Sequence, residues 1–95
     1  MDIQKAFGNS LRVARKASNL SQEDFSDVSS RTYLSSLERG LKSPTLEKVQ
    51  SLAGRMNIHP LTLMTLTYLC EANETDAKRI FDQVKSEVDK IFEKD

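Results

Sequence analysis

The sequence predicts an all-α fold of six helices. Apolar residues recur at spacings of three and four along most of the chain, which is the period of an amphipathic helix. No segment alternates apolar and polar residues as a strand would, and only 3 glycines and 2 prolines are available to interrupt helices. A length of 95 residues suffices for one domain but not for two. We therefore expect a single helical domain.

The first two predicted helices cover residues 2–17 and residues 22–28. The apolar stripe of the first recurs at intervals of four, four and three residues and consists of Ile3, Phe7, Leu11 and Ala14. Asn19 breaks that pattern. Ser21 is a suitable N-cap for the second helix, and Asp24, three residues later, completes the pattern of a capping box.

The third predicted helix covers residues 31–39 and is capped by one of the two serines before it. It ends at Gly40, because glycine tolerates the left-handed conformation that commonly follows a helix. Thr45, after a serine and a proline, is the expected cap of a fourth helix. Each boundary therefore carries a residue suited to it.

The fifth predicted helix, residues 60–72, starts at a proline, which the first helical position tolerates, and His59 caps it. It is apolar on nearly all sides, so it must be buried on more than one side. A sixth helix, residues 74–94, carries an apolar seam with heptad spacing that consists of Ala77, Phe81, Val84, Val88 and Ile91. This seam is too short for an isolated coiled coil but adequate for part of a dimer interface.

Composition argues against a membrane protein, a secreted protein and an enzyme. No apolar run approaches the roughly 20 residues that span a bilayer, and residues 1–10 lack the pattern of a signal peptide. A single cysteine, Cys70, cannot form an internal disulfide; it fits a reducing cytoplasm, and we expect it to be buried. With one histidine and no paired catalytic carboxylates, the chain is predicted to bind no metal, cofactor or small-molecule substrate.

The charge is unevenly distributed although the net charge is zero. Residues 1–59 carry nine Lys and Arg against six Asp and Glu, whereas residues 60–95 carry five against eight. The more basic part holds small polar and cationic residues on and just after the third helix. Such groups can meet base edges and phosphates, so this part of the chain is predicted to bind double-stranded DNA.

The order of these residues resembles the phage-repressor-like helix-turn-helix family, of the Cro/C1 or XRE type. The resemblance covers roughly residues 11–66, and the small controller proteins of restriction–modification systems are especially similar. It rests on Leu11-Arg12, Arg15, Leu20-Ser21-Gln22, Phe25, Arg31-Thr32-Tyr33-Leu34, Leu37-Glu38-Arg39-Gly40 and Ser43-Pro44-Thr45-Leu46. We expect a five-helix DNA-binding domain at residues 1–72 and a C-terminal dimerisation helix at residues 73–95, both within one compact unit.

The resemblance also implies roles for individual residues. The expected base-reading residues are Arg31, Thr32, Ser35 and Ser36; an arginine there can form a bidentate contact with guanine. The expected phosphate contacts are Gln22, Tyr33, Arg39, Lys42 and Ser43. Ser35 fits an exposed polar face equally well, and Tyr33 packs either beside the DNA backbone or at the edge of the core. Arg15 and Glu38 match an ion pair that joins the first helix to the third.

One segment departs from the family pattern. Between the second and third helices the family has a glycine followed by an apolar residue, whereas Val28-Ser29-Ser30-Arg31 is about two residues shorter and has no glycine. Either the connection is tighter, or the second helix loses its last turn. Both would change how deeply the third helix enters a groove.

The leading functional prediction is a homodimeric, sequence-specific regulator that binds a near-palindromic operator. The expected dimer interface consists of Leu66, Leu69, Phe81, Val84, Val88 and Ile91. Repression and activation are both compatible with the sequence. Two alternatives remain: an antitoxin that binds DNA and a protein partner, and a protein-interaction module that has lost DNA binding.

Overall fold

The computed structural model describes residues 2–94 and confirms the all-α class. Within these residues there is no strand. The elements, in chain order, are α1 (Ile3–Ala17), the 3-10 turn η1 (Gln22–Phe25), α2 (Arg31–Glu38), α3 (Leu46–Arg55), α4 (Pro60–Ala72) and α5 (Lys78–Glu93). None of the described helices is both long and apolar enough to cross a membrane.

The second and last elements are shorter than the sequence predicts. Instead of an α-helix at residues 22–28, the chain forms only η1, after which the N–H groups of Val28 and Ser29 both donate to the carbonyl of Phe25 at 2.9 Å. Of the two alternatives for this connection, the structure has the loss of the last helical turn. The predicted sixth helix is therefore the fifth α-helix, and it starts at Lys78, where Asp76 accepts the N–H of Lys78.

The predicted helix boundaries at three caps are confirmed. The Thr45 hydroxyl accepts the N–H of Lys48 at 3.1 Å, and His59 Nδ1 accepts the N–H of Leu61 at 2.9 Å. Gly40 has a φ of 73°, the left-handed conformation expected after α2. These caps satisfy backbone groups that the helix ends would otherwise leave without partners.

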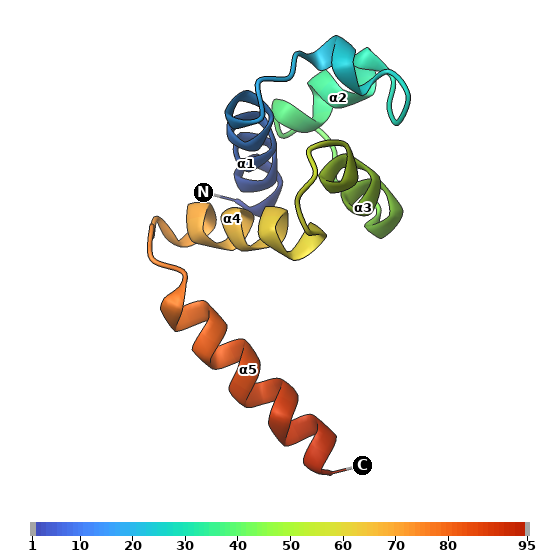
Figure 1. The fold of residues 1–95 in the computed structure, drawn as a ribbon. Coiled ribbons are helices and arrows are strands. Elements are labelled where there is room, and N and C mark those ends of the chain that lie inside the picture. Colours follow the sequence, from blue (N-terminus) through green and yellow to red (C-terminus); the bar gives the residue numbers. More distant parts are fainter. Residues whose placement is uncertain (1, 95) are drawn as a thin grey trace.

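The core lies between α1, α2, α3 and α4, which form one body (Figure 1). Its fully buried large side chains include Leu11, Phe25, Leu34, Leu37, Leu52 and Leu63. Phe25 anchors η1 in this core, so the single 3-10 turn is held in place by packing rather than by its own hydrogen bonds. The core thereby fixes η1 next to α2.

α4 is only partly covered in the single chain. Leu63, Thr67 and Leu69 are buried, but Leu61 is 67% exposed and Tyr68 is 50% exposed. The expectation that this helix is buried on more than one side is therefore not met within one chain. Its open side carries apolar surface.

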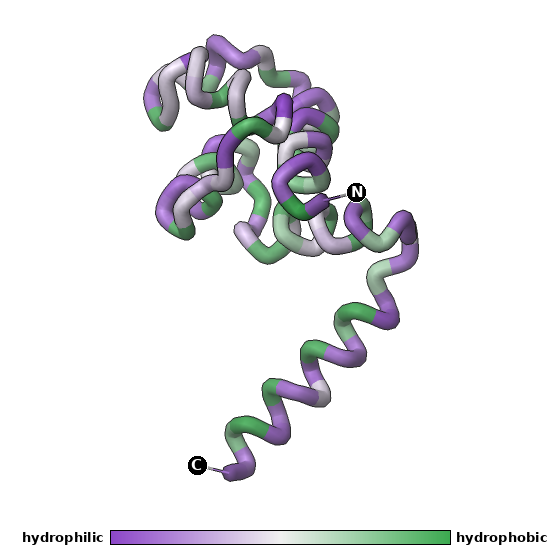
Figure 2. Tube along the Cα trace, turned by 180° about the vertical axis from the view of Figure 1, so that it is seen from behind, coloured by the Kyte–Doolittle hydropathy of each residue, from purple (hydrophilic) through white to green (hydrophobic). Residues whose placement is uncertain are grey.

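α5 extends away from this body, and none of its residues is buried (Figure 1). Figure 2 shows its apolar positions along one side, the side turned toward the rest of the molecule. Four residues of the seam are between 42% and 63% exposed, namely Phe81, Val84, Val88 and Ile91. In the single chain, α5 lies outside the compact body, whereas Glu74 and Thr75 still line a hollow beside α1.

Candidate nucleic-acid interface

The exposed side of α2 and the start of η1 form a shallow hollow of about 360 Å³. We call this hollow the reading face; it is lined by Gln22, Arg31, Thr32, Ser35 and Arg39. It brings together three of the four expected base-reading residues and two of the expected phosphate contacts. All five side chains are polar or cationic, as a surface that meets base edges and phosphates requires.

Ser36 is not part of the reading face, although it follows Thr32 by about one helical turn. It is 8% exposed and does not line the hollow. The structure therefore does not group Ser36 with the other three expected base-reading residues, and its contact with a base stays a prediction.

Tyr33 lies at the edge of the core, and the ammonium groups of two lysines contact its ring. The Nζ atoms of Lys42 and Lys48 lie 5.6 and 5.5 Å from the ring centroid. Lys48 Nζ also donates to the carbonyl of Val28 at 2.6 Å. Lys48 was missing from the sequence prediction, and no local pattern could have found it because it belongs to α3.

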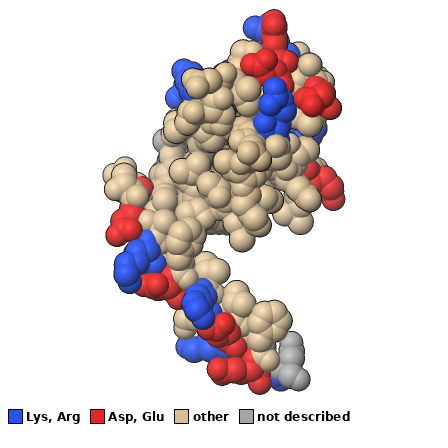
Figure 3. Space-filling view, viewed as in Figure 1, with Lys and Arg blue, Asp and Glu red and all other residues tan. Residues whose placement is uncertain are grey.

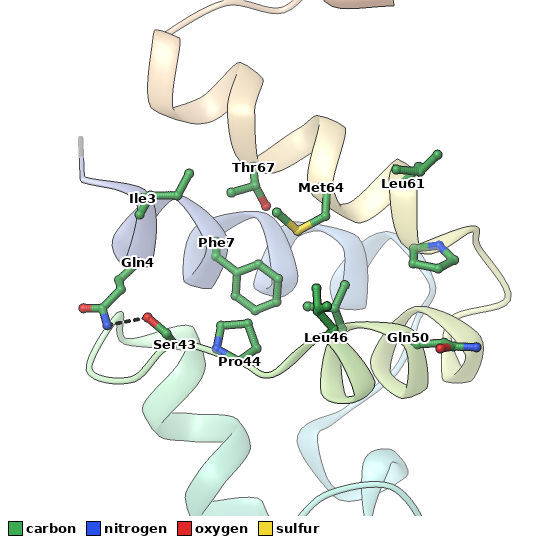
Figure 4. Close-up of a pocket in the computed structure, with 12 residues that line it drawn as sticks. Ile3, Gln4, Phe7, Ser43, Pro44, Leu46, Gln50, Leu61, Met64 and Thr67 are labelled. Atoms are coloured by element: carbon green, nitrogen blue, oxygen red, sulfur yellow. Dashed lines mark hydrogen bonds between the residues drawn. The ribbon is translucent and has the colours of Figure 1, made fainter. Parts of the chain in front are cut away.

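The loop after α2 is fastened to the start of α1. Gln4 Nε2 donates to the Ser43 hydroxyl at 2.6 Å (Figure 4). Arg39, Lys42 and Ser43 are all exposed. These expected phosphate contacts therefore lie on an anchored surface rather than on a free loop.

A buried ion pair joins α1 to α2. Arg15 Nε and Nη2 donate to the two carboxylate oxygens of Glu38 at 2.7 and 2.9 Å, and Arg15 Nη1 donates to the carbonyl of Leu20 at 3.0 Å. The two side chains are only 11% and 5% exposed. The hydrogen bonds that Arg15 donates to Glu38 raise the pKa of Arg15, although burial opposes this effect.

The same carboxylate also holds the start of η1. Gln22 Nε2 donates to Glu38 Oε1 at 3.3 Å. Arg15, Glu38 and Gln22 thus form a chain of hydrogen bonds across α1, α2 and η1. Gln22 lines the reading face, but its amide nitrogen is already engaged with the protein.

Gly8 allows α1 to approach the end of α2, and the sequence reasoning did not single it out. A Cβ atom at this position would lie 2.3 Å from the carbonyl oxygen of Leu37 and 2.7 Å from that of Glu38. The available signal was a glycine inside an otherwise regular helical stripe, which often marks a close backbone contact. Gly8 therefore sets how closely α2 is held against α1.

Two acidic residues of η1 have different roles. The carboxylate of Asp24 accepts the N–H of Ser21 at 2.7 Å and its hydroxyl at 3.0 Å, and these bonds lower the pKa of Asp24. Glu23 instead reaches across to α2, where its Oε1 accepts from Arg31 Nη1 at 3.2 Å. The Glu23 and Arg31 side chains are 76% and 69% exposed.

A second hollow of about 350 Å³ is apolar and lies between α1, α3 and α4 (Figure 4). Phe7 and Met64 point into it, and Leu46 and Leu61 are two of the exposed residues that line it. It shares no residue with the reading face, although Ser43, an expected phosphate contact, also lines it. The open apolar side of α4 thus continues from this hollow, at Leu61, to Tyr68.

The described residues do not form a metal centre. No three His, Cys, Asp or Glu side chains in residues 2–94 gather closely enough to hold an ion. His59 caps α4, and Cys70 is half-buried rather than buried, with its sulfur 3.4 Å from Asn9 Nδ2.

The helix-turn-helix family model matches residues 11–63, from the middle of α1 into α4 and including all of η1 and α2. The chain belongs to the XRE-type helix-turn-helix family. This confirms the resemblance that the sequence predicted. XRE-type proteins are DNA-binding transcriptional regulators, and α5 lies outside the matched residues.

Three relatives support this assignment. The XRE-type chain is 36% identical over 69 residues to an uncharacterized HTH-type transcriptional regulator, y4dJ, of Sinorhizobium fredii, covering 70% of this chain and 90% of that protein. It is 36% identical over 67 residues to the control protein C.SmaI of Serratia marcescens, covering 68% and 80% respectively. It is 32% identical over 75 residues to the control protein C.BamHI of Bacillus amyloliquefaciens, covering 74% and 93%.

Proposed function

We propose that the protein is a homodimeric regulator that reads a near-palindromic operator, with α2 of each subunit in a major groove. The observation that carries this proposal is the reading face, where Arg31, Thr32 and Ser35 lie together on the exposed side of α2. A helix in the major groove reads sequence through such side chains near its start.

Each residue of α2 offers a different contact. Arg31 can donate two hydrogen bonds to guanine O6 and N7, and Thr32 offers a methyl group to thymine and a hydroxyl to a base or phosphate. Ser35 is small, so the helix can approach the groove closely. Arg39, Lys42 and Ser43 follow the helix, where they would hold the phosphate backbone and fix the register without selecting a sequence.

The proposed dimer rests on apolar surface that one chain leaves open. α5 has 16 residues and is therefore about 24 Å long, yet its seam has no cover within the single chain. The open side of α4, with Leu61 and Tyr68, adds to this surface. A second copy offers the same two surfaces, so pairing about a two-fold axis would cover both.

The expected interface residues contribute unequally to this surface. Phe81, Val84, Val88 and Ile91 are exposed on α5 and supply the contact itself. Leu66 is half-buried and Leu69 is buried in the single chain, so these two support α4 from within. A two-fold dimer would place its half-sites about 34 Å apart on the DNA.

Selection from a random duplex library tests this function directly. The purified protein should enrich an inverted repeat, and Arg31→Ala should relax the preference at one position of each half-site without lowering the melting temperature. Val84→Asp combined with Val88→Asp should give monomers that bind the selected site much more weakly. Recovery of unenriched sequence by a folded dimer would refute the proposal.

The exposed seam also favours one rival, in which α5 binds a different protein, as in an antitoxin. Lys and Arg alternate with Asp and Glu along α5 (Figure 3), and ion pairs of 2.7 Å join Lys78 to Asp82 and Lys85 to Asp89. With four Lys and Arg against four Asp and Glu, α5 has no net charge that selects a particular partner. Sedimentation of the pure protein as a monomer that still binds its operator would favour this rival.

A further inference from the structure

An exposed ion pair connects η1 to the base-reading arginine. Glu23 Oε1 accepts from Arg31 Nη1 at 3.2 Å, and both side chains are more than two-thirds exposed. Pairs so open to water contribute little to folding stability. The stability of the fold therefore does not account for the presence of Glu23 beside Arg31.

Glu23 is also not needed to hold η1 in its conformation. The capping box of η1 is formed by Ser21 and Asp24. Phe25, which is fully buried, anchors the turn in the core, and Gln22 ties it to Glu38. With these contacts in place, the Glu23 side chain is available to act on Arg31 alone.

A carboxylate at this position works against DNA binding in general. It lies next to Gln22, which lines the reading face, and would repel phosphates brought close to that face. The repulsion applies to every sequence alike. An acid here is useful only if it improves the distinction between the right and the wrong site.

The geometry of the pair supplies that distinction. Glu23 engages Nη1 of Arg31, and within residues 2–94 the edge formed by Nε and Nη2 has no hydrogen-bond partner. That edge is one of the two edges of a guanidinium that can form a bidentate contact with guanine O6 and N7, and Glu23 leaves it free. Held by Glu23, Arg31 keeps the edge available for guanine and is restrained from turning to a phosphate.

We propose that Glu23 is a specificity-determining residue, which orients Arg31 for guanine and weakens binding to sites that lack it. This inference rests on the proposed function, because it presupposes that Arg31 reads a base. It predicts a loss of discrimination, not a loss of folding, when the charge of Glu23 is removed.

The test is a double-mutant cycle on DNA obtained by selection with the wild-type protein. Dissociation constants are measured for the wild type, Glu23→Gln, Arg31→Ala and the double variant, on the selected operator and on a random duplex. Glu23→Gln should raise affinity for random DNA about twofold and lower the ratio of specific to random affinity about threefold, as expected for the loss of one exposed ion pair. In the Arg31→Ala background, Glu23→Gln should leave that ratio unchanged.

A matched control removes the same charge elsewhere. Glu71 lies on an exposed part of α4, far along the chain from η1. Glu71→Gln should leave the ratio of specific to random affinity as in the wild type. All variants should melt at the wild-type temperature, since the pair is exposed.

The outcomes separate this inference from the function on which it rests. A wild-type protein that selects no sequence would overturn the proposed function, and Glu23 would lose its role with it. A second outcome is that the wild type selects an operator, but Glu23→Gln raises affinity equally for operator and random DNA, also in the Arg31→Ala background. That result would leave the proposed function intact and show that Glu23 acts only as a general charge. An unchanged ratio in Glu23→Gln would overturn the inference in the same way.

Discussion

Replacing Arg15 with alanine should destabilise the fold far more than removing any surface cation. The guanidinium donates to both oxygens of Glu38 and to the carbonyl of Leu20, and its side chain is 11% exposed. After the substitution, the Glu38 carboxylate, whose side chain is 5% exposed in the wild type, would keep only the 3.3 Å contact from Gln22. Leaving such a charge without its partner costs about 3–5 kcal/mol.

That cost is a large part of the stability of a domain of this size. The free energy of unfolding of a small domain is about 5–15 kcal/mol. A loss of 1 kcal/mol lowers the midpoint of thermal unfolding by about 4–8 °C in domains of 60–100 residues. Arg15→Ala should therefore melt roughly 12–40 °C below the wild type. Circular dichroism during heating and urea titration measures both the midpoint and the free energy of unfolding.

Two further variants make the result specific to the buried pair. Lys85→Ala removes one partner of an exposed pair of 2.7 Å on α5 and should cost less than about 0.5 kcal/mol. Arg15→Met combined with Glu38→Leu removes both charges and should recover most of the loss, because no buried charge is then left unpaired. Unchanged melting of Arg15→Ala together with lost DNA binding would refute this reasoning and make Arg15 a DNA contact.

Three other variants test separate features. Gly8→Ala should lower the free energy of unfolding by about 1–3 kcal/mol, because its Cβ would press on the Leu37 carbonyl. In the same melts Gly54→Ala, whose Cβ would have no neighbour within 4 Å, should leave that free energy unchanged or raise it by up to about 1 kcal/mol. Lys42→Ala should weaken binding to all DNA about equally and reduce the slope of affinity against salt by about one in titrations between two salt concentrations. The pKa of Asp24 is lowered in the folded state, so its contribution to stability is present above its ordinary pKa of 3.8 and is lost as pH falls through the lower folded value. Asp24→Asn should remove that part of the acid dependence of the melting temperature.

Local sequence signals predicted most helix boundaries because the physics at those boundaries is itself local. Thr45 and His59 cap helices through bonds to residues two or three positions away, and Gly40 adopts a conformation that glycine favours. The short second helix was mispredicted for the opposite reason. The backbone around Phe25 is held by burial in the core, and a spacing pattern cannot distinguish a 3-10 turn from a short α-helix when packing decides.

The reading face shows the same division between local and non-local signals. Helical periodicity groups Arg31, Thr32 and Ser35 on one side of α2, but it cannot exclude Ser36, which follows Thr32 by four residues and is set apart only by its burial. The contacts of Lys48 with Tyr33 and of Glu23 with Arg31 join different elements, so only the folded chain brings them together. Which of these residues touch DNA stays a prediction until a complex is measured.

Because the net charge is zero, DNA recognition depends on a few side chains rather than on the charge of the whole molecule. A strongly basic protein is drawn to every phosphate backbone, so its affinity for random DNA is high before any base is read. Here the cations near the reading face are offset by acids elsewhere, on η1 and in residues 71–76, so general attraction is weak. Under those conditions one carboxylate beside the base-reading arginine changes the balance between specific and random binding more than it would on a highly basic surface. The position of Glu23 therefore matters because the rest of the molecule is nearly neutral.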